Sequence, residues 1–221
     1  MGFLLQHSRI YEAGRKHWTF RHRRWLSQQS FDQPAQNAVF QDYVEAVWAA
    51  QNRRYALILR IEELLPDWTL GPLVSALRCF RGLELVSAAT IVASVGDLGR
   101  FETAGQFMSY LGLTPSEHSS GERVHRGGIT KMGNSDARRM LIEAGWSYRY
   151  PARVSQDKSD LLINQPKFVR DAAWKAQERL CKRYRQLSAR GKKSTVVVTA
   201  IARELCGFIW AIGQEFQLEP S

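Results

Sequence analysis

The chain has 221 residues, of which 44% are hydrophobic and 24% charged, so it is long enough and apolar enough to bury a globular core. Its formal net charge of +10 favours polyanionic partners, with nucleic acid first and an anionic membrane second. No apolar run approaches the roughly 20 residues that a membrane-spanning helix needs. We therefore expect a cytoplasmic protein that has no membrane partner.

The cysteines and histidines show no pattern typical of a cross-linked or metal-binding protein. Cys79, Cys181 and Cys206 are scattered and odd in number, which indicates neither a disulfide framework nor a zinc site. The five histidines show no paired ligand spacing. We expect no metal site and no cofactor within this chain.

The first third of the chain is expected to be helical and basic. A short helix is predicted near 19–29, inside a segment rich in arginine and tryptophan. Apolar residues then recur at helical spacing from about 35 to 65, which predicts one long helix that ends at Pro66. This helix could pair with another in a coiled coil or simply pack on its own domain.

Three shorter helices are predicted next, over 72–80, 85–95 and 103–111. The second is apolar on nearly every side, so it is expected to be buried, and Gly96 ends it. The stretch 112–134 is polar and rich in glycine, and loops this long inside a compact domain are usually functional or disordered. Asn134 or Ser135 is expected to cap a helix over 135–149.

The last third is predicted as a linker followed by two long helices. The linker covers 150–166 and holds Pro151 and Pro166. The first helix, about 167–190, is expected to bury a stripe that begins at Phe168 and to expose lysines and arginines, and the second runs over about 194–213. The fold class is therefore all-α, with a helix-hairpin-helix-like element and a long glycine-rich polar loop.

The hairpin-like element is centred on the turn Gly82-Leu83-Glu84. Turns with two glycines between small helices can bind DNA phosphates through backbone N–H groups at a helix N-terminus. Here Glu84 stands where the second glycine would be, and a carboxylate beside a phosphate is unfavourable. The alternative is a plain helical hairpin used for packing.

The polar loop carries a candidate nucleophile. In Ser119-Ser120-Gly121 the glycine removes crowding beside Ser120, and a serine that attacks a phosphodiester must be exposed and surrounded by positive charge. A solvated loop of the same composition is the plain alternative. The cations nearby in sequence that could hold a phosphate are Arg123, Arg126, Lys131, Arg138 and Arg139.

A second candidate surface lies in the segment 15–25. Arg23 and Arg24 stand there among tryptophans and histidines, a mixture that allows base stacking together with phosphate contact. The alternative is that Trp18 and Trp25 only anchor a short helix.

Four blocks in this order resemble the insertion-sequence 110/116/902 family of transposases. They are Arg81-Gly82-Leu83 with Ala88-Ala89-Thr90, then Gly96-Asp97-Leu98-Gly99-Arg100-Phe101, then Tyr110 to Gly121, then Gly127 to Asn134 with Arg138-Arg139. Trp18, Arg23-Arg24-Trp25 and the region 167–213 also look like that family, so the resemblance covers almost the whole chain.

The resemblance implies a DNA transposition and recombination protein in which a C-terminal domain supplies a serine nucleophile. Members pair this domain with an N-terminal RNase H-like domain whose DEDD acids bind metal, so Mg²⁺ is expected only with that domain. A noncoding guide RNA assists recognition of DNA. The serine before glycine corresponds to Ser120, and Ser119 is its neighbour. DNA, a guide RNA and a second copy of the chain are the expected partners.

The sequence shows no early strand pattern carrying an acid of the DEDD set. We therefore expect residues 1–66 to be the end of a connecting helical or coiled-coil region, and 67–221 to be the C-terminal transposase domain. Whether the isolated chain is an enzyme stays open, because the family is implied to need both the acids and the serine. The alternative function is a catalytically inactive nucleic-acid-binding remnant or a regulator of a full-length transposase.

Overall fold

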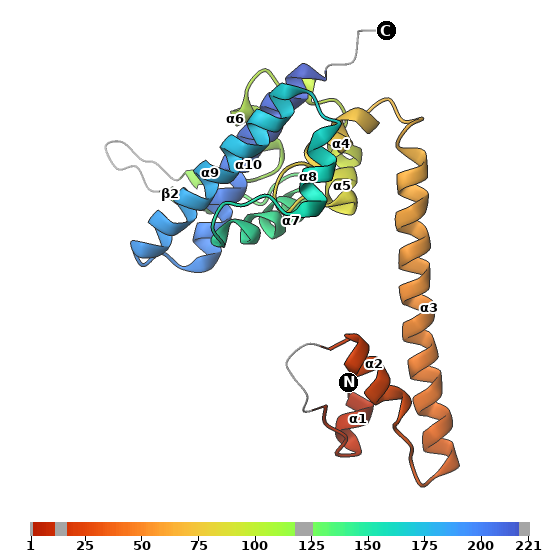
Figure 1. Ribbon diagram of the computed structural model, residues 1–221. Coiled ribbons are helices and arrows are strands. Elements are labelled where there is room, and N and C mark those ends of the chain that lie inside the picture. The colour runs from red at the N-terminus through yellow and green to blue at the C-terminus, as the bar shows by residue number, and fades with distance from the viewer. Residues whose placement is uncertain (1, 12–16, 118–125, 217–221) are drawn as a thin grey trace. The chain divides into compact units, whose positions relative to one another are not determined.

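A computed structural model describes residues 2–11, 17–117 and 126–216 (Figure 1). The chain divides into two compact units, Met1–Leu57 and Ile58–Ser221. The long helix α3, Pro34–Leu64, contributes residues to both units and matches the helix predicted over 35–65. The domain division expected at residue 66 stays a prediction.

The first unit holds α1 (Gly2–Gln6), α2 (Phe20–Ser27) and the beginning of α3. The hydroxyl of Thr19 accepts a hydrogen bond from the backbone N–H of His22 and so caps α2. Aromatic residues form a small core, in which the ring centres of Phe31 and Phe40 lie 5.4 Å apart. Its buried members are Leu4, Leu26, Phe31 and Phe40.

The second unit is a layered helical domain around α10, Ser194–Glu215. Helix α10 packs against α6 (Ala104–Tyr110), α7 (Ser135–Gly145) and α9 (Lys167–Ala189). Helix α5 (Leu85–Val95) packs against α4 (Gly71–Leu77) and α7. Short 3₁₀ turns, η1 (Leu98–Arg100) and η2 (Trp146–Arg149), follow α5 and α7.

By length and composition alone, α10 could also cross a membrane, since its mean hydropathy over 18 residues is 1.7. Half of that stretch is buried inside the unit. Arg203 and Glu204 lie in the middle of the helix. These features are typical of the central helix of a globular core.

The all-α prediction is confirmed, and most predicted helices lie within a few residues of their expected ends. The polar stretch 112–134 differs from a plain loop, because β1 (Pro115–Glu117) and β2 (Arg126–Ile129) pair antiparallel within it. In the described part of the chain these are the only two strands. The register matches Pro115 with Ile129 and Glu117 with Arg126, with an irregularity between the two pairs.

Two predictions for the last third of the chain were wrong. The expected linker 150–166 contains the helix α8, Gln156–Ile163, whose Lys158 is buried. Phe168 was expected to begin the buried stripe of α9, but its side chain is 38% exposed and Val169 is buried instead. The buried face of α9 therefore begins one residue later than the sequence pattern indicated.

Candidate nucleic-acid interface

The strands β1 and β2 form the base of a hairpin on the second unit. The backbone N–H of Thr130 donates to the carbonyl of Thr114 at 2.9 Å, and the Ser116 hydroxyl donates to the carbonyl of Gly128 at 3.1 Å. Residues 118–125, which join the strands, lie outside the described residues. The predicted nucleophile Ser120 and the predicted phosphate ligand Arg123 belong to that segment.

Two glycines fix the chain where the hairpin leaves the helices. Gly112 and Gly133 both have positive φ, at 64° and 99°. A Cβ at Gly112 would collide with the Met132 carbonyl, and one at Gly133 would collide with that of Tyr110. The backbone N–H of Lys131 donates to the carbonyl of Gly112 at 3.0 Å. The glycines therefore allow the two ends of the hairpin to lie against each other, with the Lys131 side chain exposed.

The N-terminus of α7 adjoins this hairpin base. Asn134 caps the helix by accepting from the backbone N–H groups of Asp136 and Ala137, as the sequence predicted. Arg138 is half-buried and donates to the carbonyl of Leu111 at 2.9 Å, while Arg139 is exposed and lies 3.9 Å from the Asp136 carboxylate. Arg138 thus helps to join α7 to the end of α6, in addition to any role toward a phosphate.

Arg23 and Arg24 belong to the first unit, on α2. Arg23 donates to the side-chain oxygen of Gln51 at 3.1 Å, and its guanidinium lies 4.7 Å from the centre of the Trp48 ring. Arg24 is exposed. Arg23 is held on α3, whereas the structure records no side-chain partner for Arg24 among the described residues.

The turn between α4 and α5 packs closely on α7. Gly82 has φ of 83°, and a Cβ there would lie 2.6 Å from the carbonyl oxygen of Ala144. The Ser87 hydroxyl accepts from the backbone N–H of Glu84 at 2.8 Å and so caps α5. Of the two readings of this turn, the geometry favours the packing hairpin, because its glycine is needed for contact with α7.

Lys158 of α8 explains how Glu84 is accommodated in this turn. Its ammonium donates to the carbonyls of Arg78 and Leu83 at 2.6 and 2.7 Å and lies 3.0 Å from the Glu84 carboxylate. The side chain is almost fully buried. The sequence analysis missed this residue, because nothing in a polar stretch between two prolines distinguishes a buried lysine from a solvated one.

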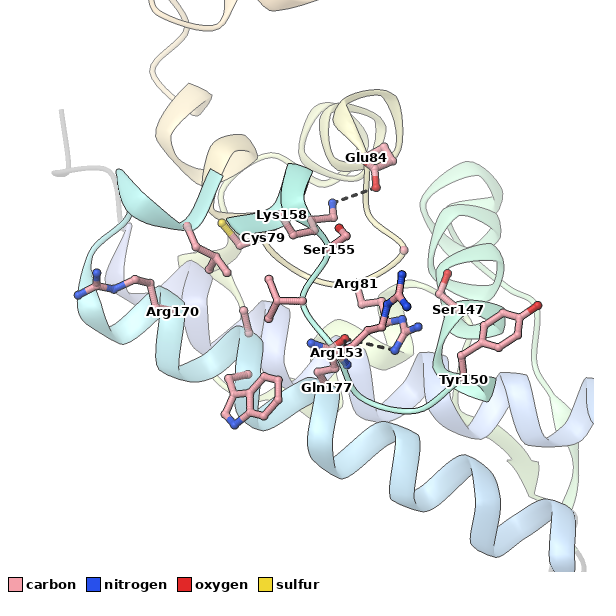
Figure 2. A pocket seen from close by; sticks show the side chains of 15 residues that line it. Cys79, Arg81, Glu84, Ser147, Tyr150, Arg153, Ser155, Lys158, Arg170 and Gln177 are labelled. Atoms are coloured by element: carbon pink, nitrogen blue, oxygen red, sulfur yellow. Dashed lines mark hydrogen bonds and ion pairs between the residues drawn. The ribbon is translucent and has the colours of Figure 1, made fainter. Parts of the chain in front are cut away.

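A pocket of about 330 Å³ opens beside the turn and α8 (Figure 2). Four cationic side chains and one carboxylate, that of Glu84, line the pocket. The cations are Arg81, Arg153, Lys158 and Arg170. Burial raises the pKa of the Cys79 thiol, which also lines the pocket, to about 11. That thiol stays protonated near neutral pH, so it supplies no thiolate for chemistry here.

Cys79, Cys181 and Cys206 are all buried free thiols. Within the described ranges no group of three or more His, Cys, Asp or Glu side chains is placed to hold a metal ion. These residues therefore offer no ligand set for the Mg²⁺ that the family resemblance implies.

Comparison with known proteins defines the class to which this helical domain and its hairpin belong. Residues 74–158 match the Transposase IS116/IS110/IS902 family, and that range holds the α4–α5 turn, the hairpin, α7 and Lys158. This part of the chain therefore carries a domain found in transposases of insertion sequences. Within that class it matches the IS116/IS110/IS902 family, which the sequence blocks resemble.

The chain is similar to several proteins over much of its length. It is 51% identical over 213 residues to a putative transposase y4qE of Sinorhizobium fredii, which covers 96% of this chain and 51% of that protein. It is 28% identical over 195 residues to the transposase for insertion sequence element IS1533 of Leptospira borgpetersenii, covering 87% and 56%. The chain spans about half the length of these relatives.

Proposed function

We propose that this chain acts in DNA transposition and supplies the serine nucleophile of the reaction. The family match over residues 74–158 carries this proposal, because that range contains the Ser-Ser-Gly step of the hairpin. In the proposed step the Ser120 oxygen forms a bond to a strand phosphorus, and the bond to the leaving deoxyribose oxygen breaks as that oxygen takes up a proton. The phosphoserine link conserves the phosphodiester energy, so a second strand hydroxyl can rejoin the strand without ATP.

The cations around the hairpin base are the proposed phosphate ligands. Lys131 is exposed beside Gly112, and the amide-rich N-terminus of α7 favours negative charge. Arg123, Arg126 and Arg138 complete the set by their place in the sequence. Arg139 on α7 and Arg23 and Arg24 on α2 are proposed to contact strand backbone further from the reacting phosphate.

The finer features of the proposal come from the family resemblance. A guide RNA is proposed to assist DNA recognition, a second copy of the chain to complete the assembly, and a metal-binding acidic domain to act together with the serine. The protein is proposed to work in the cytoplasm, where a bacterial DNA-acting protein meets its substrate. A regulator that binds the same nucleic acids without chemistry is the second candidate, favoured by the lack of a metal-ligand cluster among the described residues.

Nucleic-acid binding by the isolated chain is the first test. We expect it to bind duplex DNA or structured RNA with strong salt dependence, because the chain carries a formal charge of +10. About six phosphate contacts would give a slope of about −5 when the logarithm of the binding constant is plotted against that of the salt concentration. A titration that shows no affinity at low salt would contradict the proposal.

The serine is tested in a longer transposase that contains both this chain and a metal-binding acidic domain. Ser120→Ala should abolish strand exchange and leave nucleic-acid binding nearly unchanged, because one hydroxyl is lost without a change in charge. Ser119→Ala is the matched control and should retain exchange. Recombination by the Ser120→Ala protein would assign the nucleophile to another residue, and retained binding without exchange by the unaltered protein would favour the regulator.

A further inference from the structure

We propose that the pocket of Figure 2 binds one unpaired nucleotide of a nucleic-acid strand, with its phosphate on Arg81 and Arg153 and its base against Trp174. This inference rests on the proposed function only in that the chain binds nucleic acid. The pocket lies beside the α4–α5 turn and α8, and it is lined by none of the residues assigned above to the hairpin site.

The charge of the pocket calls for an anion. Lys158 and Glu84 lie 3.0 Å apart and neutralise each other. Arg81, Arg153 and Arg170 then remain without a carboxylate partner among the lining residues. Figure 2 shows the guanidinium groups of Arg81 and Arg153 on the same side of the pocket, toward Ser147 and Tyr150. An anion bound between like charges in one pocket reduces their mutual repulsion.

The hydrogen-bonding groups of these side chains are only partly used. One terminal nitrogen of Arg81, Nη1, donates to the carbonyl of Pro151 at 2.7 Å and to the side-chain oxygen of Gln177 at 3.2 Å. That same Gln177 oxygen accepts from the backbone N–H of Arg153 at 3.4 Å, so it links the Arg81 guanidinium to the backbone of Arg153. Across the described residues, the other terminal nitrogen of Arg81 and the whole guanidinium of Arg153 have no partner.

Gln177 adds a second unused donor. Its side chain is only 7% exposed and lines the pocket, yet its amide nitrogen has no hydrogen-bond partner in the part of the chain that the structure describes. Each guanidinium is planar and can donate two parallel hydrogen bonds to phosphate oxygens, and the Gln177 amide that lines the same pocket is a further donor.

The rest of the wall suits a base. Trp174 is 42% exposed and Val154 43% exposed, although both line a concave site, and Leu162 adds to the same apolar surface. A free phosphate would leave this surface uncovered, whereas a base can stack on the indole ring. A volume of about 330 Å³ suits a ligand of nucleotide size. A base pair within a duplex cannot enter such a hollow, so the nucleotide must be unpaired.

The test compares a 20-base-pair DNA duplex with the same duplex carrying one bulged nucleotide, and repeats the pair in RNA. Fluorescence anisotropy at fixed salt should show about tenfold tighter binding to the bulged form, in DNA, RNA or both, since one stacked base contributes roughly that factor. The nucleic acid that shows the preference is the source of the nucleotide. Arg153→Ala and Trp174→Ala should each remove the preference and leave binding to the plain duplex within about twofold.

Arg190→Ala is the matched control, since it removes one exposed charge from the end of α9, outside the pocket. It should keep the preference for the bulged form. Equal affinity for bulged and plain forms in both nucleic acids would overturn the inference, as would equal loss of the preference in Arg190→Ala. Failure to bind any of the four probes would instead contradict the proposed function. Circular dichroism of each variant confirms that it is folded.

Discussion

At the scale of single residues, Lys158 connects α8 to a segment of the chain some 75 to 80 positions earlier. Its ammonium contacts the end of α4, the α4–α5 turn and the N-terminus of α5 from a position on α8. Removing a charge from water is costly, so a lysine this buried requires all its donors to be used. The three contacts meet that requirement and fix the turn next to the pocket.

Replacing Lys158 with methionine keeps the length of the side chain and removes its donors. The carbonyls of Arg78 and Leu83 would then lack their partner in a buried place, so the free energy of unfolding should fall by about 3 kcal/mol. Urea denaturation followed by circular dichroism measures this. Lys167→Met is the control, because Lys167 is exposed and pairs only with Asp171 one helical turn away. Equal stability of the two variants would show that the Lys158 contacts contribute little.

The role of a single residue could be predicted from the sequence where its contacts are with neighbouring residues. Asn134 was expected to cap α7 because its side chain can accept from the next backbone N–H groups, and it does. The role could not be predicted where the contacts are with residues far away in the sequence. Gly82 is fixed by the approach of Ala144, 62 positions further along, and Lys158 by carbonyls some 75 to 80 positions earlier. The spacing of residues within one helix does not indicate contacts between residues so far apart in the sequence.

At the scale of elements, periodicity predicted long helices well and short amphipathic pieces poorly. Helix α5 was predicted with its observed ends, because an apolar run meets Gly96. Helix α8 was missed because its eight residues are mostly polar and lie between two prolines. The pairing of β1 with β2 was missed because strands of three and four residues carry no readable alternation.

Helix α2 carries a buried histidine that should make the first unit sensitive to acid. Burial, and then repulsion from His17, lowers the pKa of His22 below 6.5. As the pH falls, His22 therefore takes up a proton in the unfolded chain before it does so in the folded chain. The first unit keeps its full free energy of unfolding above pH 6.5 and loses part of it as the pH falls below that value. Between pH 7 and pH 5 the free energy of unfolding of this unit should fall by at most about 1.4 kcal/mol per pH unit, and its unfolding temperature should drop accordingly. Scanning calorimetry at each pH measures the lower-temperature transition.

His22→Asn is the matched variant for that measurement. Nδ1 of His22 accepts from the backbone N–H of Trp18 at 3.1 Å, and an asparagine oxygen can take over this bond without titrating. The variant should show a flatter pH dependence over the same range. A drop as large as that of the unaltered chain would assign the acid sensitivity to other groups.

At the scale of the whole molecule, the buried residues fall into two clusters of very different size. The first unit buries four hydrophobic side chains around Phe40, whereas the second builds one large core around α10 that includes Leu141. Small cores stabilise a chain only marginally, because little apolar surface leaves water. The charge of +10 and the helical class could be predicted from composition and periodicity, but this unequal division depends on which distant residues meet.

The unequal cores predict two separate unfolding transitions when the chain is heated, with the first unit melting at the lower temperature. Phe40→Ala removes a ring that is 3% exposed, so it should destabilise the first unit by about 3 to 4 kcal/mol and move only the lower transition. Leu141→Ala, at a fully buried position of α7, should move only the upper transition by about 3 kcal/mol. Scanning calorimetry resolves the transitions, and the substitution that shifts each transition assigns it to a unit. A single transition that both substitutions shift together would show instead that α3, which is continuous from one unit to the other, makes them unfold as one.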